Sequence, residues 1–136
     1  MKIVFFLVCL FSLVSIVSAE VIDVNIKGVD DGRKTNKQQD YKEAVMNAKL
    51  QAIEQAGASI ESITKVVNFE LQYDAIESQS KGILLPGFQI IDIGYVTDGT
   101  YQVVLVGKIQ AGDKDTFETG ALRYAKSLFD RGKIEE

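Results

Sequence analysis

Residues 28–35, GVDDGRKT, come closer to a ligand-binding motif than any other segment of the sequence. They lie between an expected strand and an expected helix, where a phosphate-binding P-loop is found. That motif requires glycine directly before Lys-Ser/Thr, so that the backbone can wrap the phosphates. Here Arg33 holds this position and Gly32 comes one residue too early. Asp30 and Asp31 would also bring negative charge towards a phosphate. We therefore interpret the segment as a solvated turn of mixed charge.

Carboxylates are the remaining groups that could do acid–base chemistry without histidine. Asp92 is the notable one, because it lies in an expected strand between Ile91 and Ile93. It could act as an acid or base if the strand turned it towards the core. We expect instead that Asp92 faces solvent or lies at a bulge. With Lys34, it is the obvious candidate if the protein were an enzyme.

Two further groups of polar residues are weaker candidates. Asp113, Asp115 and Glu118 could bind calcium, but they lack the ordered spacing and the glycine of a dedicated loop. We interpret them as charges that favour the start of a helix. The neighbouring Ser80 and Lys81 form a pair too common to indicate a Ser-Lys active site.

The composition excludes several kinds of chemistry. The sequence has no histidine, and its one cysteine, Cys9, lies in the N-terminal leader. Metal sites of the Cys/His kind and Ser-His or Cys-His nucleophile pairs are therefore excluded from the mature chain. We expect no enzyme, no cofactor and no catalytic, cofactor-binding or metal-ligating residue. The net charge of −4, with no local basic patch, also argues against nucleic acid as a partner.

Residues 1–19 have the layout of a secretory signal peptide. Lys2 is followed by an apolar run, and the small residues Ser18 and Ala19 stand at the cleavage position. An uncleaved N-terminal anchor is the alternative, and no later segment has the apolar length of a transmembrane helix. We expect cleavage after Ala19 and a periplasmic or secreted protein. A cysteine for lipid attachment is missing from the cleavage point.

The mature chain begins with a strand and a helix. Residues 20–28 alternate between apolar and polar, which is typical of a half-buried strand. Residues 40–57 show helical spacing along a stripe rich in alanine, and this stripe is expected to be core. Asp40 with Glu43 indicates a capping pair, and Gly57 suits the helix end. The stripe comprises Tyr41, Ala44, Val45, Ala48, Ala52 and Ala56.

Residues 59–81 support two interpretations. Ile63, Val67 and Leu71 have helical spacing, whereas Val67, Phe69, Leu71 and Tyr73 alternate as in a strand. The enrichment in Thr, Val and Phe favours a strand over residues 62–73, followed by a polar connection over residues 78–82.

The later part of the chain predicts a hairpin. Residues 88–96 and 101–109 flank Asp98-Gly99, a strong turn signal in which both residues tolerate positive φ. The second strand should be central and covered on both faces, and Pro86 indicates an edge position or a bulge. These elements predict an α+β fold, an antiparallel sheet of about four strands with a long helix packed across it.

The pattern from Tyr41 to Ile109 resembles the N-terminal domain of flagellar assembly protein T and, more distantly, the small outer-membrane lipoproteins related to it. The resemblance lies in EAVMNAKLQAIEQAG, the extended run of residues 59–91 and the closing GTYQVVLVGKI. It implies an α+β domain over residues 20–112 that acts through protein contacts in the bacterial envelope. In that family such contacts help to build rings around the flagellar basal body. The resemblance carries over no ligand-binding residue.

Residues 113–136 predict a C-terminal helix that docks on the domain or begins a helical repeat. We therefore expect an exported, non-catalytic module for protein interaction or assembly. Its partners would be envelope proteins, with basal-body or outer-membrane ring components as the family suggests, and self-association is open. The alternative is a periplasmic protein that binds a small ligand or an envelope component in an apolar cleft between sheet and helix.

Overall fold

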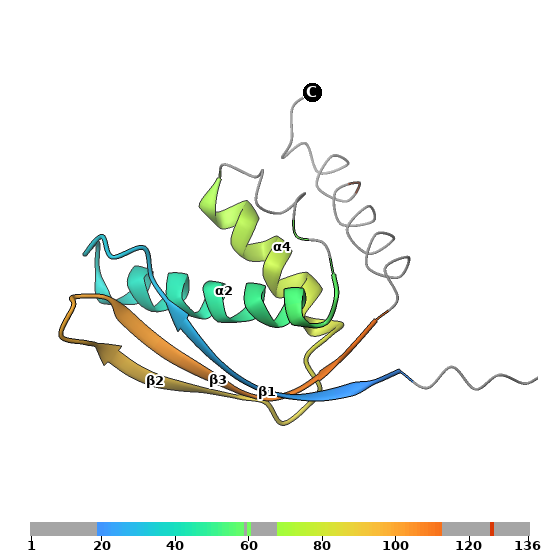
Figure 1. The fold of residues 1–136 in the computed structure, drawn as a ribbon. Coiled ribbons are helices and arrows are strands. Elements are labelled where there is room, and N and C mark those ends of the chain that lie inside the picture. The colour runs from blue at the N-terminus through green and yellow to red at the C-terminus, as the bar shows by residue number, and fades with distance from the viewer. Residues whose placement is uncertain (1–18, 59, 61–67, 113–125, 127–136) are drawn as a thin grey trace, which may run out of the picture.

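The computed structural model describes residues 19–58, 60, 68–112 and 126. Its elements follow the order β1 (Val21–Val29), α2 (Lys37–Gln55), α4 (Phe69–Lys81), β2 (Gln89–Tyr95) and β3 (Tyr101–Gln110). The strands form an antiparallel sheet in the order β1-β3-β2, and both helices lie on one side of it (Figure 1). The α+β class is confirmed. The sheet has three strands among the described residues, however, and the expected number of about four is wrong.

Strand β1 and helix α2 behave as the sequence predicts. In β1, Val24 and Ile26 are buried, while Asp23, Asn25 and Lys27 are exposed. The alanine stripe of α2 packs on the sheet, and Gly57, with φ of 88°, follows the end of the helix. The buried residues on this stripe are Ala44, Val45, Ala48, Ala52, Ile53 and Ala56.

The contact between α2 and β1 is closest at Gly28. A methyl group added to this glycine would lie 2.1 Å from the carbonyl oxygen of Ala44 and 2.7 Å from Cβ of Ala48. Both distances are far shorter than a carbon atom tolerates, so only glycine fits without moving the helix. The small alanines of α2 and Gly28 of β1 thus set the spacing between helix and sheet.

Helix α4 corrects the prediction of a strand over residues 62–73. Residues 62–67 lie outside the described part of the chain, but Phe69–Tyr73 are helical. Asn68 is the N-cap, and its side-chain oxygen accepts a hydrogen bond from the Leu71 amide at 3.2 Å. The strand-like alternation of Phe69, Leu71 and Tyr73 was misleading, because these side chains are only partly buried.

The side chains that anchor α4 come later and have helical spacing. Ala75, Ile76 and Ser80 are buried, so the expected polar connection over residues 78–82 is instead the end of the helix. Buried Lys49 of α2 forms an ion pair with Glu77 of α4. Such a pair joins the two helices, since removing either partner would leave a charge buried alone.

The β2–β3 hairpin is confirmed, with a different turn from the one expected. Gly99 donates to the carbonyl of Val96 at 2.9 Å, and Val96 donates to Thr100 at 2.9 Å. Gly99 has φ of 88°, whereas no non-glycine residue in the described ranges has a positive φ. Asp98 contributes through its side chain instead, which accepts from the Thr100 amide at 2.8 Å. This is a type I turn followed by a left-handed glycine.

The prediction for Pro86 is confirmed, because it precedes the edge strand β2. Leu84 forms an isolated bridge with Ile109 of β3, and regular pairing resumes only at Gln89. Pro86 and Gly87, which has φ of 95°, form the turn between these two pairings. Proline is tolerated here since an edge strand can lack an amide donor.

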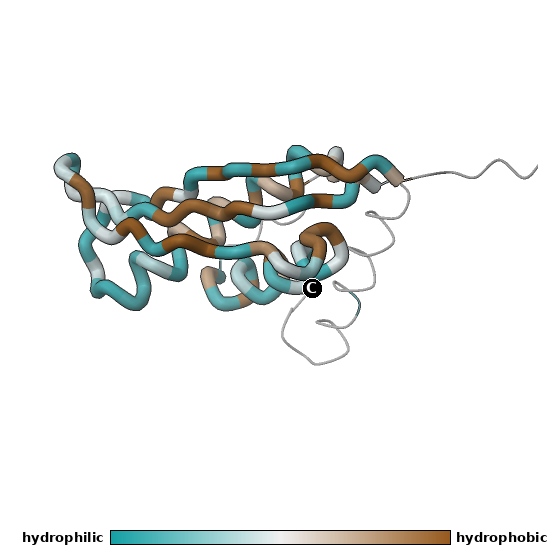
Figure 2. The backbone as a smooth tube through the Cα atoms, turned by 90° about the horizontal axis from the view of Figure 1, so that it is seen from below, coloured by the Kyte–Doolittle hydropathy of each residue, from teal (hydrophilic) through white to brown (hydrophobic). Residues whose placement is uncertain are grey.

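The prediction that β3 is covered on both faces is wrong. Strand β3 is central, and its buried residues Tyr101, Val103 and Leu105 face the helices. Val104 and Val106 alternate with them, and Val106 is exposed. No described element covers the other face of the sheet, which Figure 2 shows from below with hydrophobic stretches along β2 and β3. We call it the open face.

The predicted C-terminal helix and the signal peptide lie outside the described residues, apart from Ala19 and Lys126. Among the helices that are described, none combines the length and the apolar character needed to span a membrane.

The Gly28 contact gives a stability prediction. Gly28→Ala should lower the free energy of unfolding by about 1–3 kcal/mol, because the methyl group must push α2 away from the sheet. Gly82→Ala is the matched control, since its Cβ would meet only Gln79 at 3.6 Å and its φ is −81°. That control should stay within about 0.5 kcal/mol of wild type. Urea unfolding of both variants measures the difference, and equal losses would contradict the close contact.

Candidate functional site

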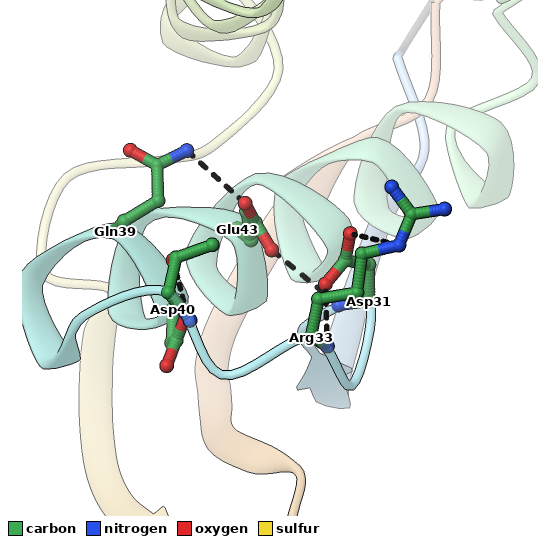
Figure 3. Close-up of polar contacts among 6 residues, drawn as sticks. Asp31, Arg33, Gln39, Asp40 and Glu43 are labelled. Atoms are coloured by element: carbon green, nitrogen blue, oxygen red, sulfur yellow. Dashed lines mark hydrogen bonds and ion pairs between the residues drawn. The ribbon is translucent and has the colours of Figure 1, made fainter.

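Three carboxylates, one from the loop after β1 and two from α2, meet beside the first turns of α2. Asp30 directly follows β1, while Asp40 and Glu43 belong to α2. One oxygen from each of the three lies within 4.8 Å of the others. Asp40 and Glu43 share one face of the helix because they are three residues apart. Figure 3 shows these two side chains with Gln39 and with the loop that carries Asp31 and Arg33.

The start of α2 explains the position of Asp40. The N-cap is Asn36, whose side chain accepts from the Gln39 amide at 2.9 Å, so the expected Asp40–Glu43 capping pair is wrong. Asp40 lies one turn further and is fully buried. Its Oδ1 accepts hydrogen bonds from the Thr35 hydroxyl at 2.7 Å and the Thr35 amide at 3.2 Å.

Two tyrosines from the hairpin complete the cluster. Tyr95 donates its hydroxyl hydrogen bond to Oδ2 of Asp40. Tyr101 is buried and donates to both oxygens of Asp92, at 2.7 and 2.9 Å. The Tyr95 and Tyr101 rings meet edge to face, with their centroids 4.9 Å apart. The hairpin and the helix start are thus joined by side-chain hydrogen bonds.

These contacts shift the acidity of the groups involved. Hydrogen bonds from Tyr95, and then from Thr35, hold the pKa of Asp40 below its usual 3.8 although burial opposes them. The same bond to Asp40, with burial, raises the pKa of Tyr95 to about 12. Burial, and then the bond to Asp92, raises the pKa of Tyr101 to about 12. At neutral pH, Asp40 is therefore ionised and both phenols are protonated.

Asp30 has an unusual environment within the cluster. Its Oδ1 accepts from the Tyr101 amide at 2.9 Å, and its own amide donates to the Tyr101 carbonyl at 3.1 Å. Its Oδ2 is buried and has no hydrogen-bond partner among the described residues. A buried polar atom left without a partner is costly and therefore calls for an explanation.

The residues singled out from the sequence are only partly brought together. Asp92 is exposed and lies at the β-bulge between Asp92 and Gly94, as predicted. Lys34 lies over the Tyr95 ring, with Nζ 5.6 Å from the ring centroid. Ser80 donates to the carbonyl of Glu77 at 3.0 Å and lies on α4, away from this cluster. Asp113, Asp115 and Glu118 lie outside the described residues.

Residues 31–35 of the near-P-loop segment form an exposed loop of mixed charge, as predicted, whereas Gly28 and Val29 belong to β1 and Asp30 is buried. Arg33 pairs with Asp31 at 3.7 Å, and the Asp31 carboxylate accepts from the Arg33 amide at 2.8 Å. Arg33 is thereby held by its own loop, an arrangement that supports the turn interpretation.

A surface pocket of about 330 Å³ lies beside the cluster. Its lining comprises Lys37, Gln38, Tyr41, Asp92 and Tyr101. The pocket is at the low end of the size range of small-molecule sites. It combines aromatic rings with both charge signs.

Sequence reasoning missed this cluster, because its members are separated by up to 71 residues, as for Asp30 and Tyr101. One local signal was present: Asn36 followed three residues later by Gln39 is a capping pattern that would have placed the helix start correctly. The comparisons with known proteins add no guide, since no family model, curated protein or solved structure matches the chain.

The raised pKa of Tyr101 gives a pH prediction. Tyr101→Phe should cost about 1 kcal/mol at neutral pH, through the lost hydrogen bond to Asp92. Tyrosine in the unfolded chain ionises near 10.0 and folded Tyr101 near 12, so its stabilising effect is complete below pH 10 and is lost as the pH rises towards 12. The gap in unfolding free energy between wild type and variant should therefore shrink above about pH 10. A gap that stays constant up to about pH 12 would contradict the buried, hydrogen-bonded phenol.

Proposed function

We propose that this chain is an exported, non-catalytic module for protein interaction or assembly in the bacterial envelope, similar to a domain that assembles rings at the flagellar basal body. The proposal combines the leader-like residues 1–19, the absence of histidine from the sequence and the resemblance over residues 41–109. The mature protein would be periplasmic or secreted, and it would act by binding other envelope proteins.

The observation that carries this proposal is the open face of the sheet together with its edge strand β2. Ile91 and Ile93 are 46% and 51% exposed, and Val106 of β3 is also exposed. Ile91 is aligned with Val104, so apolar side chains of neighbouring strands adjoin each other on this face. Large apolar side chains gathered on one face favour a protein partner over water.

The edge of β2 supports the same proposal. Strand β2 pairs only with β3 in the described part of the chain, so its outer edge offers backbone donors and acceptors. Its sequence QIIDIGY contains one charged residue, Asp92, which is bonded to Tyr101. An edge with so little charge can add a strand from a partner.

Binding of a small ligand or envelope component is the second candidate. The pocket beside Tyr41 and Tyr101 favours it, since aromatic walls with a few polar groups are typical of ligand sites. The interface between α2 and β1 offers little room for the expected cleft, because Gly28 contacts α2 directly. A ligand would therefore bind at the rim of that interface.

Site-specific photo-crosslinking in living cells tests the interaction proposal. A photoreactive residue at Ile91 should form crosslinks to a defined envelope protein, because its side chain is exposed on β2. The matched control carries the same group at Glu54, which is exposed on α2. Identification of the crosslinked protein by mass spectrometry names the partner and shows whether it is a ring component.

The outcome decides between the two candidates. Crosslinks from position 91 that are absent from position 54 would support the interaction module. A protein that forms no crosslink from either position and fractionates alone in the periplasm would contradict it. The ligand-binding candidate would then be pursued at the pocket beside Tyr41.

A further inference from the structure

We propose that Asp30, Asp40 and Glu43 form a binding site for a calcium ion, which joins the end of β1 to the start of α2. This inference does not depend on the proposed function. It goes against the expectation, drawn from the sequence, that no residue ligates a metal. That expectation rested on the lack of histidine and of a loop motif, whereas this site depends on residues that the fold brings together.

The first argument is the chemistry of the three side chains. Their oxygens lie within 4.8 Å of one another. Oxygen donors without nitrogen or sulfur suit hard cations such as calcium. Calcium–oxygen bonds of about 2.3–2.6 Å place opposite ligands about 4.6–5.2 Å apart, so oxygens no more than 4.8 Å from one another can share one ion. The spread of the three carboxylates is therefore compatible with a calcium ion without movement of the backbone.

The second argument is the unpartnered oxygen of Asp30. Asp30 is only 8% exposed, and its Oδ2 is buried without a hydrogen-bond partner in the described part of the chain. Its other oxygen is fixed by the Tyr101 amide, which limits rotation of the carboxylate. The free oxygen thus belongs to a side chain that is held in the cluster, and a cation would satisfy it.

The third argument is the charge balance. Among the described residues, no lysine or arginine forms an ion pair with Asp30, Asp40 or Glu43. The nearby Arg33 is paired with Asp31, and Lys34 lies over the Tyr95 ring. The start of α2 favours negative charge, but a helix end supplies only about half a unit of positive charge. A divalent ion would balance the remaining repulsion.

The geometry also explains why the ligands would be held in place. Asp40 is fixed by Thr35 and Tyr95, and Glu43 accepts from Gln39 at 3.0 Å. Hydrogen bonds of this kind orient metal ligands in known sites. With three protein carboxylates and water completing the shell, we expect a dissociation constant of about 10⁻⁴ to 10⁻³ M, the range of extracellular calcium modules.

Calorimetric titration of the chelator-treated protein with CaCl₂ tests the proposal. Wild type should bind one Ca²⁺ in the stated range, and its melting temperature should rise with Ca²⁺ concentration. Glu43→Gln should weaken binding at least tenfold, and so should Asp30→Asn. The matched control is Glu54→Gln, which makes the same change at an exposed residue of the same helix and should bind as wild type does.

A second readout does not depend on heat. Terbium bound at the cluster should be excited through Tyr95, which is bonded to the ligand Asp40, and added Ca²⁺ should quench that emission by displacement. Circular dichroism of Glu43→Gln confirms that the variant is folded, so that lost binding reports the site. The proposal is overturned if wild type binds no Ca²⁺ at about 10⁻² M, well above the expected dissociation constant, or if Glu43→Gln and Glu54→Gln bind it equally well.

Discussion

At Gly28 the backbone of β1 lies against α2 so closely that a single methyl group would collide with Ala44 and Ala48. This contact places the helix flat on the β1–β3 part of the sheet, where buried residues of both elements form the core. It also places the N-terminal part of α2, which carries Asp40 and Glu43, beside Asp30, two residues after Gly28. The carboxylate cluster and the hairpin bonds of Tyr95 and Tyr101 depend on that placement. A helix further from the sheet would separate Asp40 from Tyr95.

The same arrangement leaves the sheet with two unlike faces. Both helices are on one side, so the apolar side chains of the other side remain without a covering element in the described residues (Figure 1). The alternation of β3 shows the consequence: Val103 and Leu105 are buried, whereas Val106 is exposed. The helix-covered face forms the core, and the open face is the one to which the proposed function assigns protein contacts.

Much of this fold could be predicted from local pattern. The alternation of β1, the alanine stripe of α2 and the Asp98-Gly99 turn each follow from short-range physics. The bounds of the three strands differ from the predicted ones by one residue at most, whereas α2 begins at Lys37, three residues before the predicted start. The errors came from tertiary context. Residues 69–73 alternate like a strand, yet Asn68 caps them as a helix that packs through Ile76. The unbroken apolar run of β3 predicts two covered faces. This prediction is wrong because the sequence does not show whether helices pack on one face of the sheet or on both. The cluster around Asp40 was equally hidden, since Asp30, Asp40 and Tyr95 are neighbours only after the sheet and helix pack.

The proposed function requires that a partner covers the open face in the cell, while the helix-covered face is the core. Hydroxyl-radical footprinting tests this most directly, because it reads the solvent exposure of individual side chains in the purified protein and in intact envelopes. Ile91 and Ile93 should react in the purified protein and be protected in envelopes, with Glu54 and Gln55 of α2 unchanged. Equal reactivity of these β2 side chains in both samples would contradict the proposed function.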